Sequence, residues 1–335
     1  MDLIPFSNIL KFRRIIKCSH GSKKWDDGST HELRQPHHIY FKIVSYFCKV
    51  RRTYMKEIDI TQWAQIGEGG NGATYVNNAE PGVLLKVSYL ELAQADELVQ
   101  EFQVSKAIEE LGVSTPRMLE LVSVNGRAAI KSQAIPGKKS FARLCHDNPD
   151  KLDDYAVQMA GLARRFHATA AAGNKDIPSM KALMTEAVSS SEMLSSKAKK
   201  HVQEFVDSLE DAPNLLHGDF TFSNLIQADE KAYWIDLGRA THGLPYFDLG
   251  HFYLFCNIFG RQKRVQEITH MTDAQMARFW DTFAREYAGT DDITSFNNSC
   301  KRFAALDIVL LGHIQTLTFS ERFFLGMLAK KMIKA

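Results

Sequence analysis

The sequence predicts an α+β protein with two lobes, a small β-rich lobe followed by a larger helical lobe. Two observations predict this class. Glycine turns and strand-like alternation dominate residues 58–87, whereas the chain after about residue 140 carries apolar residues at helical spacing. The 335 residues are enough for two units with a substantial core. A β-rich front and a helical back predict an enzyme with a cleft between its lobes.

Residues 1–54 differ in charge from the rest of the chain. They hold 11 Lys and Arg against 4 Asp and Glu, while the remaining residues hold 30 against 35. The mildly acidic body argues against nucleic-acid binding. Composition shifts at Met55, which we expect to be the natural start. Residues 1–54 are then a basic extension that is poorly ordered or not part of the natural protein; a docking segment or a lipid- or RNA-binding arm is the alternative.

Cysteines and apolar stretches bear on where the protein works. The five cysteines form no CxxC or CxxH spacing, and an odd, scattered set indicates reduced thiols and a cytoplasmic protein. No secretory signal is evident. The apolar stretches at residues 244–260 and 305–319 contain Asp and His, so neither reaches about 18 uninterrupted apolar residues. We therefore expect two buried helices and no membrane span.

The first lobe, which we bound at residues 55–137, is expected to begin with three strands. Residues 58–87 alternate short β-type runs with two turns, a glycine cluster and "NNAEPG". A helix follows over about residues 91–111, because apolar residues recur on one side and Gly112 ends it. A hairpin through Asn125-Gly126 and the extended connector "AIPGKKS" complete the lobe.

The second lobe, residues 138–335, is expected to be mainly helical. Residues 151–170 place apolar side chains at spacings of three and four, which predicts an amphipathic helix. Further helices are expected over residues 194–210, 245–260, 272–288 and 300–330.

The glycine cluster "GEGGNG" suggests a phosphate-binding loop. Gly67, Gly69 and Gly72 fit G-x-G-x-x-G, a string that dinucleotide-binding folds also use. In those folds the glycines open a helix, whereas here the β-prone "ATYV" follows and is too short for one. A glycine turn between two strands fits the flap that covers ATP phosphates with backbone N–H groups. A hairpin tip without a ligand is the alternative.

Lys86 in "VLLKVS" is the second candidate for nucleotide binding. Period-2 alternation puts Leu84 and Lys86 on one face of the strand and the neighbouring apolar residues on the other. An inward lysine is unfavourable unless it meets anions, which ATP phosphates and a helix glutamate would supply. Glu97 and Glu101 lie one helical turn apart; we prefer Glu101 and keep Glu97 open. A strand lysine that extends into solvent is the alternative.

A hairpin is expected where "NLIQ" and "AYWI" flank "ADEK". With Ala228–Lys231 as its loop, Asn224 lies opposite Ile235. Asp236 is then diagonal to Asn224, within roughly 7–8 Å by sheet geometry. Asp219, five residues before Asn224 in "HGDFTFSNLI", enters the same region from the preceding loop.

These three oxygen-bearing side chains are the parts that phosphoryl transfer requires. Asn224 and Asp236 can hold Mg²⁺, which favours carboxylate and amide oxygens together with phosphate. Asp219 would orient and deprotonate an acceptor hydroxyl. The bound metal would neutralise charge on the transferred phosphoryl group.

The spacing H-G-D-x-x-x-x-N followed by I-D-L-G resembles the aminoglycoside phosphotransferase and choline kinase group of the protein-kinase-like superfamily. The resemblance covers residues 58–260 well and the remainder loosely. It implies ATP between a five-stranded front lobe and a helical rear lobe, with adenine against the connector near Ser132 and Ile135. Asp248 in "YFDLGHF" resembles the family's later acid, which we expect to support the catalytic loop together with His217.

The predicted function is an ATP- and Mg²⁺-dependent kinase for a hydroxyl of a small molecule, such as an amino alcohol, a sugar or an aminoglycoside-like compound. The helices after Asp248 are aromatic and not densely acidic, which disfavours a polycationic acceptor. One alternative is a kinase of a cell-envelope saccharide or a protein, although eleven residues between Asp236 and Asp248 are few for an activation segment. The other is a nucleotide-binding pseudokinase, against which the complete set of catalytic residues argues.

Overall fold

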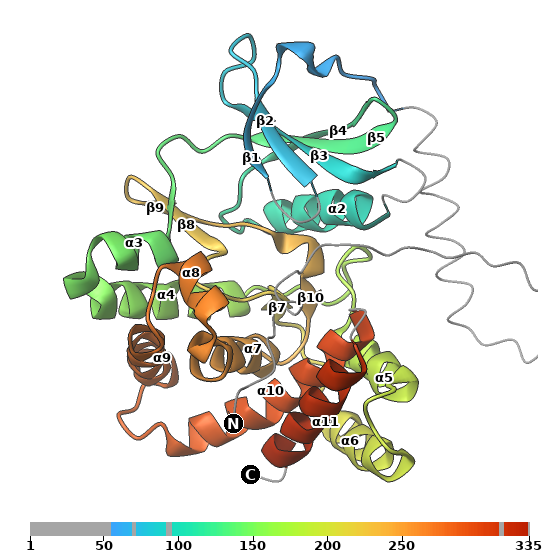
Figure 1. Ribbon diagram of the computed structural model, residues 1–335, viewed down its shortest axis with the longest axis vertical. Coiled ribbons are helices and arrows are strands. Elements are labelled where there is room, and N and C mark those ends of the chain that lie inside the picture. Colours follow the sequence, from blue (N-terminus) through green and yellow to red (C-terminus); the bar gives the residue numbers. More distant parts are fainter. Residues whose placement is uncertain (1–54, 69–71, 92–95, 315–317, 334–335) are drawn as a thin grey trace, which may run out of the picture. The chain divides into compact units, whose positions relative to one another are not determined.

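The computed structural model describes residues 55–68, 72–91, 96–314 and 318–333 (Figure 1). Residues 1–54 and Gly69 lie outside the described residues, so the predictions made for them stay predictions. In the described chain, residues 55–99 and 119–132 form one compact unit, and residues 100–118 and 133–333 form another. The proposed lobe boundary at residue 137 also stays a prediction. No described helix combines the length and the apolar character that crossing a membrane requires.

A five-stranded antiparallel sheet opens the structure and confirms the β-rich front. A short 3-10 helix, η1 (Ile60–Gln62), precedes it. The strand order is β1-β2-β3-β5-β4. The strands are β1 (Ala64–Glu68), β2 (Gly72–Val76), β3 (Val83–Glu91), β4 (Met118–Val124) and β5 (Arg127–Gln133).

The alternation in β3 sets which face of the sheet is buried. Leu85 and Val87 are buried and pack with Trp63, Val122, Val124 and Ala129. Lys86 lies on the opposite face, half-buried, where it is the register partner of Thr74 in β2. The predicted face for Lys86 is therefore confirmed.

The turn between β4 and β5 follows its sequence signal. Asn125 and Gly126 both have positive φ, 49° and 74°, as a two-residue hairpin loop with matching twist requires. Helix α2 (Asp96–Glu110) lies between β3 and β4 in the chain, and ends close to the predicted point.

The C-terminal unit is mainly helical, as predicted (Figure 1). Its helices are α3 (Phe141–Asp147), α4 (Leu152–His167), α5 (Met180–Ser190), α6 (Ser196–Ser208), α7 (Tyr246–Asn257), α8 (Lys263–Thr269), α9 (Asp273–Ala288), α10 (Thr294–Ile314) and α11 (Phe319–Ile333). Short 3-10 helices are η3 (Pro149–Lys151), η4 (Leu237–Arg239) and η5 (Phe259–Arg261). Short strands are β6 (Lys139–Ser140), β7 (Leu215–Leu216), β8 (Leu225–Ala228), β9 (Lys231–Trp234) and β10 (Thr241–His242).

The predicted single helix over residues 300–330 is wrong, because two helices, α10 and α11, occupy that stretch. The second helix has its own start signal. The Thr318 hydroxyl accepts from the Glu321 N–H at 3.3 Å, and the Glu321 carboxylate accepts from the Thr318 N–H at 2.7 Å. This reciprocal pair is a capping box, the S/T-x-x-E pattern that opens a helix. The apolar run across residues 305–319 concealed it.

Aromatic side chains form the centre of the C-terminal core. Phe220 and Phe222, between β7 and β8, are fully buried and contact Phe252 of α7 edge-on. Further fully buried aromatic residues, Phe279, Trp280 and Phe283, come from α9. The segment that carries Asp219 is thus anchored in the core by the residues on either side of Thr221. Among the described residues, Cys145, Cys256 and Cys300 are free and buried.

Candidate active site

Residues 217–224, called the HGD loop below, carry two of the predicted site residues. Phe220 and Phe222 point into the core, while Asp219 keeps about 29% of its side chain exposed. The apolar residues therefore hold the loop in place and leave the acid accessible. Alternating anchors of this kind explain why a stretch rich in polar residues can cross the core.

The peptide groups of Ile235 tie the HGD loop to the β8–β9 hairpin. The Ile235 N–H donates to the Asn224 carbonyl at 3.0 Å, and the Ile235 carbonyl accepts from Nε2 of His217 at 3.0 Å. The His217 Nδ1 in turn accepts from the Asp219 N–H at 3.3 Å, so the Nε2–H tautomer satisfies both bonds. Both ends of the loop thus meet the residue directly before Asp236.

The hairpin itself matches its predicted register. Gln227 pairs with Ala232, as expected, and Asn224 lies opposite Ile235. The strands run one residue further than predicted on each side, because Ala228 pairs with Lys231. The connection is therefore the two-residue turn Asp229–Glu230, in which Asp229 has φ 52°.

Asn224 and Asp219 contact each other directly. The Asn224 side-chain nitrogen donates to the Asp219 carbonyl at 2.8 Å and to Oδ2 of Asp219 at 3.0 Å. With its nitrogen committed to Asp219, the amide presents its oxygen as the atom that can bind a cation. That Asn224 binds the metal and Asp219 the acceptor hydroxyl stays a prediction.

The fit of this region to Mg²⁺ follows from its donors. Asp236 is half-buried and lies at the start of η4, where its backbone has the left-handed conformation, with φ 61° and ψ 47°. The amide oxygen of Asn224 and the carboxylate of Asp236 are ligands that Mg²⁺ accepts. In the part of the chain that the structure describes, no group of three His, Cys, Asp or Glu side chains could hold a metal. Phosphate oxygens and water would therefore have to complete the coordination shell, as is usual for Mg²⁺.

Two glycines explain close approaches around these acids. Gly218 has φ +76°, and a Cβ added there would lie 2.1 Å from the Arg239 carbonyl oxygen. Only glycine fits both the backbone conformation and the space. A Cβ on Gly238 would lie 3.0 Å from Cβ of Glu101, so α2 packs directly against the "IDLG" segment. This contact brings Glu101 beside the residues that follow Asp236; the pairing of Glu101 with Lys86 stays a prediction.

Asp248 supports the HGD loop, as predicted. Its Oδ2 accepts from the His217 N–H at 2.6 Å, and its Oδ1 accepts from the Gly218 N–H at 2.9 Å. His167 lies 3.1 Å from Oδ2 and hydrogen-bonds Tyr287 through its other nitrogen. Burial alone would raise the pKa of the Asp248 carboxyl, but these partners, His167 first, hold that pKa below its usual range.

His251 of α7 is a site residue that the sequence did not predict. Its Nε2 lies 3.3 Å from Oδ1 of Asp219, and its Nδ1 lies 3.0 Å from Oδ2 of Asp307 in α10. Burial opposes the charged imidazole, yet the carboxylates of Asp307 and Asp219 raise the pKa of His251 to about 10. Burial likewise opposes the charge on Asp219, but His251 holds its pKa well below the usual range. The sequence does carry a sign of this pair, because His251 and Asp307 are polar residues within the otherwise apolar stretches that form α7 and α10.

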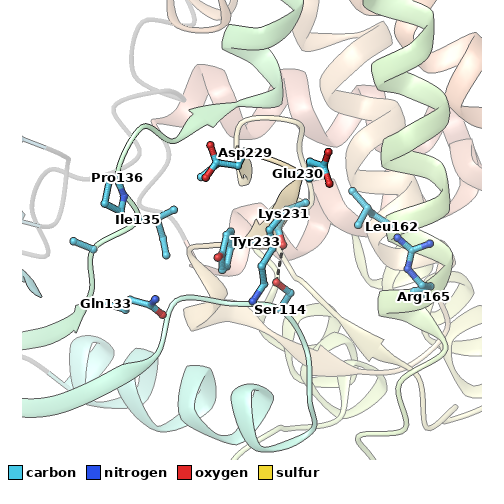
Figure 2. A pocket seen from close by; sticks show the side chains of 13 residues that line it. Ser114, Gln133, Ile135, Pro136, Leu162, Arg165, Asp229, Glu230, Lys231 and Tyr233 are labelled. Atoms are coloured by element: carbon cyan, nitrogen blue, oxygen red, sulfur yellow. Dashed lines mark hydrogen bonds between the residues drawn. The ribbon is translucent and has the colours of Figure 1, made fainter. Parts of the chain in front are cut away.

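The connector lines a pocket of about 710 Å³ within the C-terminal unit. Figure 2 shows Ile135 and Pro136 from the connector around the same space as Tyr233 and Lys231 of β9. Ser114 contributes from the segment after α2, where its hydroxyl donates to the Ala232 carbonyl at 2.6 Å. Ser132, by contrast, is buried at the end of β5. That Ser132 and Ile135 contact adenine stays a prediction.

The strands around the glycine cluster form as expected. Gly67 lies in β1 opposite Thr74, beside an irregularity in pairing that begins after Gln65, and Gly72 opens β2. Gly69 and the turn itself lie outside the described residues. Phosphate binding by this flap therefore stays a prediction.

A five-stranded antiparallel sheet followed by a helical region with an H-G-D-x-x-x-x-N loop is the arrangement expected of a phosphotransferase. The chain belongs to the phosphotransferase enzyme family, whose sequence profile matches residues 62–291. A search of curated protein sequences finds no significant match.

Solved structures share the fold at low sequence identity. A thermostable mutant of aminoglycoside phosphotransferase APH(4)-Ia matches with TM-score 0.51 and 14% identity, over 82% of this chain and 94% of that one. A further variant of that thermostable enzyme, in a ternary complex with ADP and hygromycin B, matches with TM-score 0.52 and 12% identity, over 87% and 98%. A choline/ethanolamine kinase family protein from Mesorhizobium loti gives TM-score 0.51 and 14% identity, over 82% and 88%. At these identities the similarity establishes the fold and no acceptor.

Proposed function

We propose that this phosphotransferase transfers the γ-phosphoryl group of ATP, with Mg²⁺, to a hydroxyl group of a small molecule. The observation that carries the proposal is the HGD loop, in which Asp219, Asn224 and the backbone beside Asp236 are held together by hydrogen bonds. In the reaction, a bond forms between the acceptor oxygen and the γ-phosphorus, and the bond from that phosphorus to ADP breaks. The acceptor proton leaves through Asp219.

The state of Asp219 suits orientation of the acceptor. Its pKa lies well below the usual range, so the carboxylate is charged at neutral pH and accepts a hydrogen bond from the hydroxyl. Transfer of a phosphoryl group passes through a loose transition state, for which positioning and charge stabilisation matter more than strong basicity. When bound by Asn224 and Asp236, Mg²⁺ would neutralise charge on the phosphates. Lys86, Glu101 and the flap of Gly67, Gly69 and Gly72 would bind the nucleotide.

Two considerations support the acceptor class: the role proposed for Asp219 requires a hydroxyl group, and two structural neighbours are described with a compound or a family name. APH(4)-Ia was solved with hygromycin B, and another neighbour is described as a choline/ethanolamine kinase family protein. A sugar-like compound or an amino alcohol is therefore the acceptor that we infer. The lobes would be residues 55–137 and 138–335, with ATP between them.

An acceptor screen tests the proposal. ADP release is measured with MgATP and a panel of amino alcohols, monosaccharides and aminoglycosides, and mass spectrometry checks each active compound for one added phosphoryl group. We expect one class of hydroxyl acceptor to raise ADP release, and EDTA to abolish it. Nucleotide binding without ADP release on any acceptor would support a pseudokinase instead. Phosphate appearing on a protein or a cell-envelope saccharide, and on no small molecule, would contradict the acceptor class.

A further inference from the structure

Helix α7 contacts three consecutive residues of the HGD loop through two side chains one turn apart. Asp248 binds the backbone N–H groups of His217 and Gly218, and His251 binds the carboxylate of Asp219. His251 is almost buried, with 10% of its side chain exposed. The residue that holds His251 from the other side, Asp307, comes from α10, which packs against α7.

Both oxygens of the Asp219 carboxylate are thereby engaged. Oδ2 accepts from the Asn224 amide at 3.0 Å, and Oδ1 lies 3.3 Å from the His251 Nε2. A carboxylate with a donor on each oxygen has one favoured rotation about its Cβ–Cγ bond. The remaining lone pairs then point in fixed directions, which is the condition for orienting a hydroxyl. Displacement by about 1 Å can lower a rate by on the order of 10²-fold.

We propose that His251 is a positioning residue of the phosphoryl transfer, in which it fixes the Asp219 carboxylate while Asp307 fixes its imidazole ring. The inference rests on the proposed function, because Asp219 is the catalytic base there. It extends beyond the part of the chain that the family profile matches, since Asp307 lies after residue 291. Through Asp307, α10 would thus help to position the Asp219 carboxylate.

The charges around the imidazole favour its protonated form. Asp219 faces it from the HGD loop and Asp307 from α10, and these two carboxylates hold the pKa of His251 at about 10. Asp248 on α7 is itself bonded to His167 and the loop backbone. Arg239 and His217 also act on the Asp219 carboxylate and lower its pKa. A neutral imidazole would leave the half-buried Asp219 and the nearly buried Asp307 carboxylates around one uncharged ring, which is unfavourable.

The sign of the pH dependence follows from the raised pKa. With its pKa raised to about 10, the folded-state imidazolium persists through neutral pH and is lost as pH rises through about 10. Turnover should therefore decline on the alkaline side near pH 10. Replacing Asp307 by Asn keeps a hydrogen-bond acceptor for the ring but removes one of its two anions. The alkaline decline should then move to lower pH by one unit or more.

The experiment compares His251→Asn and Asp307→Asn with a control, His313→Gln, which changes an exposed histidine of the same helix α10. ADP release from MgATP with water as the acceptor is measured from pH 6 to pH 10.5 on the full chain. We expect kcat to fall by on the order of 10–10²-fold in His251→Asn, with the KM for ATP within about twofold. Asp307→Asn should shift the alkaline limb, and His313→Gln should match the wild type.

A second measurement does not depend on activity. In protein labelled with ¹⁵N-histidine, the ring nitrogens of His251 should report an imidazolium at pH 8, assigned by its loss in His251→Asn. Asp307→Asn should lower its titration midpoint, whether or not turnover survives. A neutral ring at pH 8, or a midpoint unchanged by Asp307→Asn, overturns the proposal.

The outcomes separate the two proposals. A wild type that hydrolyses no ATP and phosphorylates no acceptor overturns the proposed function, and with it this role for His251. An active wild type whose His251→Asn variant keeps kcat and the alkaline limb overturns only the positioning role. An equal loss of kcat in His313→Gln would show that the effect is structural, and so would also overturn it.

Discussion

Strand β1 and the HGD loop are both expected to contact the nucleotide, yet they are built in opposite ways. All five residues of β1 are exposed, and its pairing with β2 is irregular near Gly67. The HGD loop is anchored by fully buried Phe220 and Phe222 and bound to the backbone of Ile235 and to Asp248. Regions with few buried contacts open locally at low free energy, whereas braced regions open only with the whole fold. Asp219, the proposed catalytic residue, thus lies on the braced element, whereas Gly67, which is expected to help cover phosphates, lies on the exposed strand.

The largest effect on turnover should come from Asp219→Asn in the HGD loop. The substitution removes the carboxylate charge and leaves the size of the side chain almost unchanged. We expect turnover to fall by on the order of 10²–10⁴-fold, because the amide cannot accept the acceptor proton, while ATP affinity changes little. ADP-release kinetics and calorimetric titration with MgATP measure the two quantities. Asp150→Asn, at an exposed aspartate of η3, is the control and should keep full turnover. Full turnover in Asp219→Asn would remove this residue from the mechanism.

Gly218→Ala tests how tightly the loop is braced. The added Cβ meets the Arg239 carbonyl oxygen at 2.1 Å in a left-handed backbone conformation, so the free energy of unfolding should fall by about 3 kcal/mol or more. Gly289→Ala is the matched control, since Gly289 has a similar φ of +68° but no atom within 4 Å of its Cβ position. It should cost about 1 kcal/mol. Denaturant unfolding measures the free energy of unfolding of both variants. Equal losses in the two would mean that the HGD loop can shift to accept the added Cβ and is not tightly braced.

Asp248→Asn should weaken the same loop by about 2 kcal/mol, since it removes the charge that faces His167 and two backbone N–H groups. The pKa of Asp248 is lowered in the fold, so its stabilisation is full above the unfolded value of about 3.9 and is lost as pH falls through the lower folded value. In Asp248→Asn the free energy of unfolding should therefore fall less steeply as the pH is lowered. Denaturant unfolding of both proteins from pH 2 to pH 7 measures this difference. Asp153→Asn, which removes an exposed pair with Arg278, should cost no more than about 1 kcal/mol.

The smallest effect is expected in β1. Ile66 in β1 is 58% exposed, so Ile66→Ser should change the free energy of unfolding by less than about 0.5 kcal/mol. Thermal or denaturant unfolding is sufficient to measure it. A loss above 2 kcal/mol would show that β1 is packed as firmly as the HGD loop, and the contrast between the two regions would fail.

Local signals predicted most of the fold. Alternation in β3 placed Lys86 on the correct face, Asn125-Gly126 marked its hairpin, and the "ADEK" turn placed Asn224 opposite Ile235. Each of these depends on residues close in the chain. The break between α10 and α11 was missed although Thr318 and Glu321 signal it, because apolar residues on both sides suggested continuity.

The candidate site was predictable only where its residues are near in sequence. Asp219 and Asn224 are five residues apart and share one loop, so spacing was sufficient. His251 and Asp307 are 56 residues apart, and only the packing of α7 on α10 brings them together. Asp248, His251 and Asp307 are buried polar residues in apolar helices. Their burial predicts that each has a hydrogen-bonding partner, but the sequence does not identify that partner. The contact of Glu101 with Gly238 likewise depends on tertiary packing.

The two backbone hydrogen bonds of Ile235, one through its N–H and one through its carbonyl, restrict how the chain length of this region can vary. An inserted residue between Trp234 and Asp236 would move either the N–H or the carbonyl away from its partner and carry the acid off its position. Additions at the Asp229–Glu230 tip would leave both bonds intact, because the strands below the tip keep their register. Length variation among natural relatives of this hairpin should therefore be confined to its tip, while the segment before the acid keeps a constant number of residues.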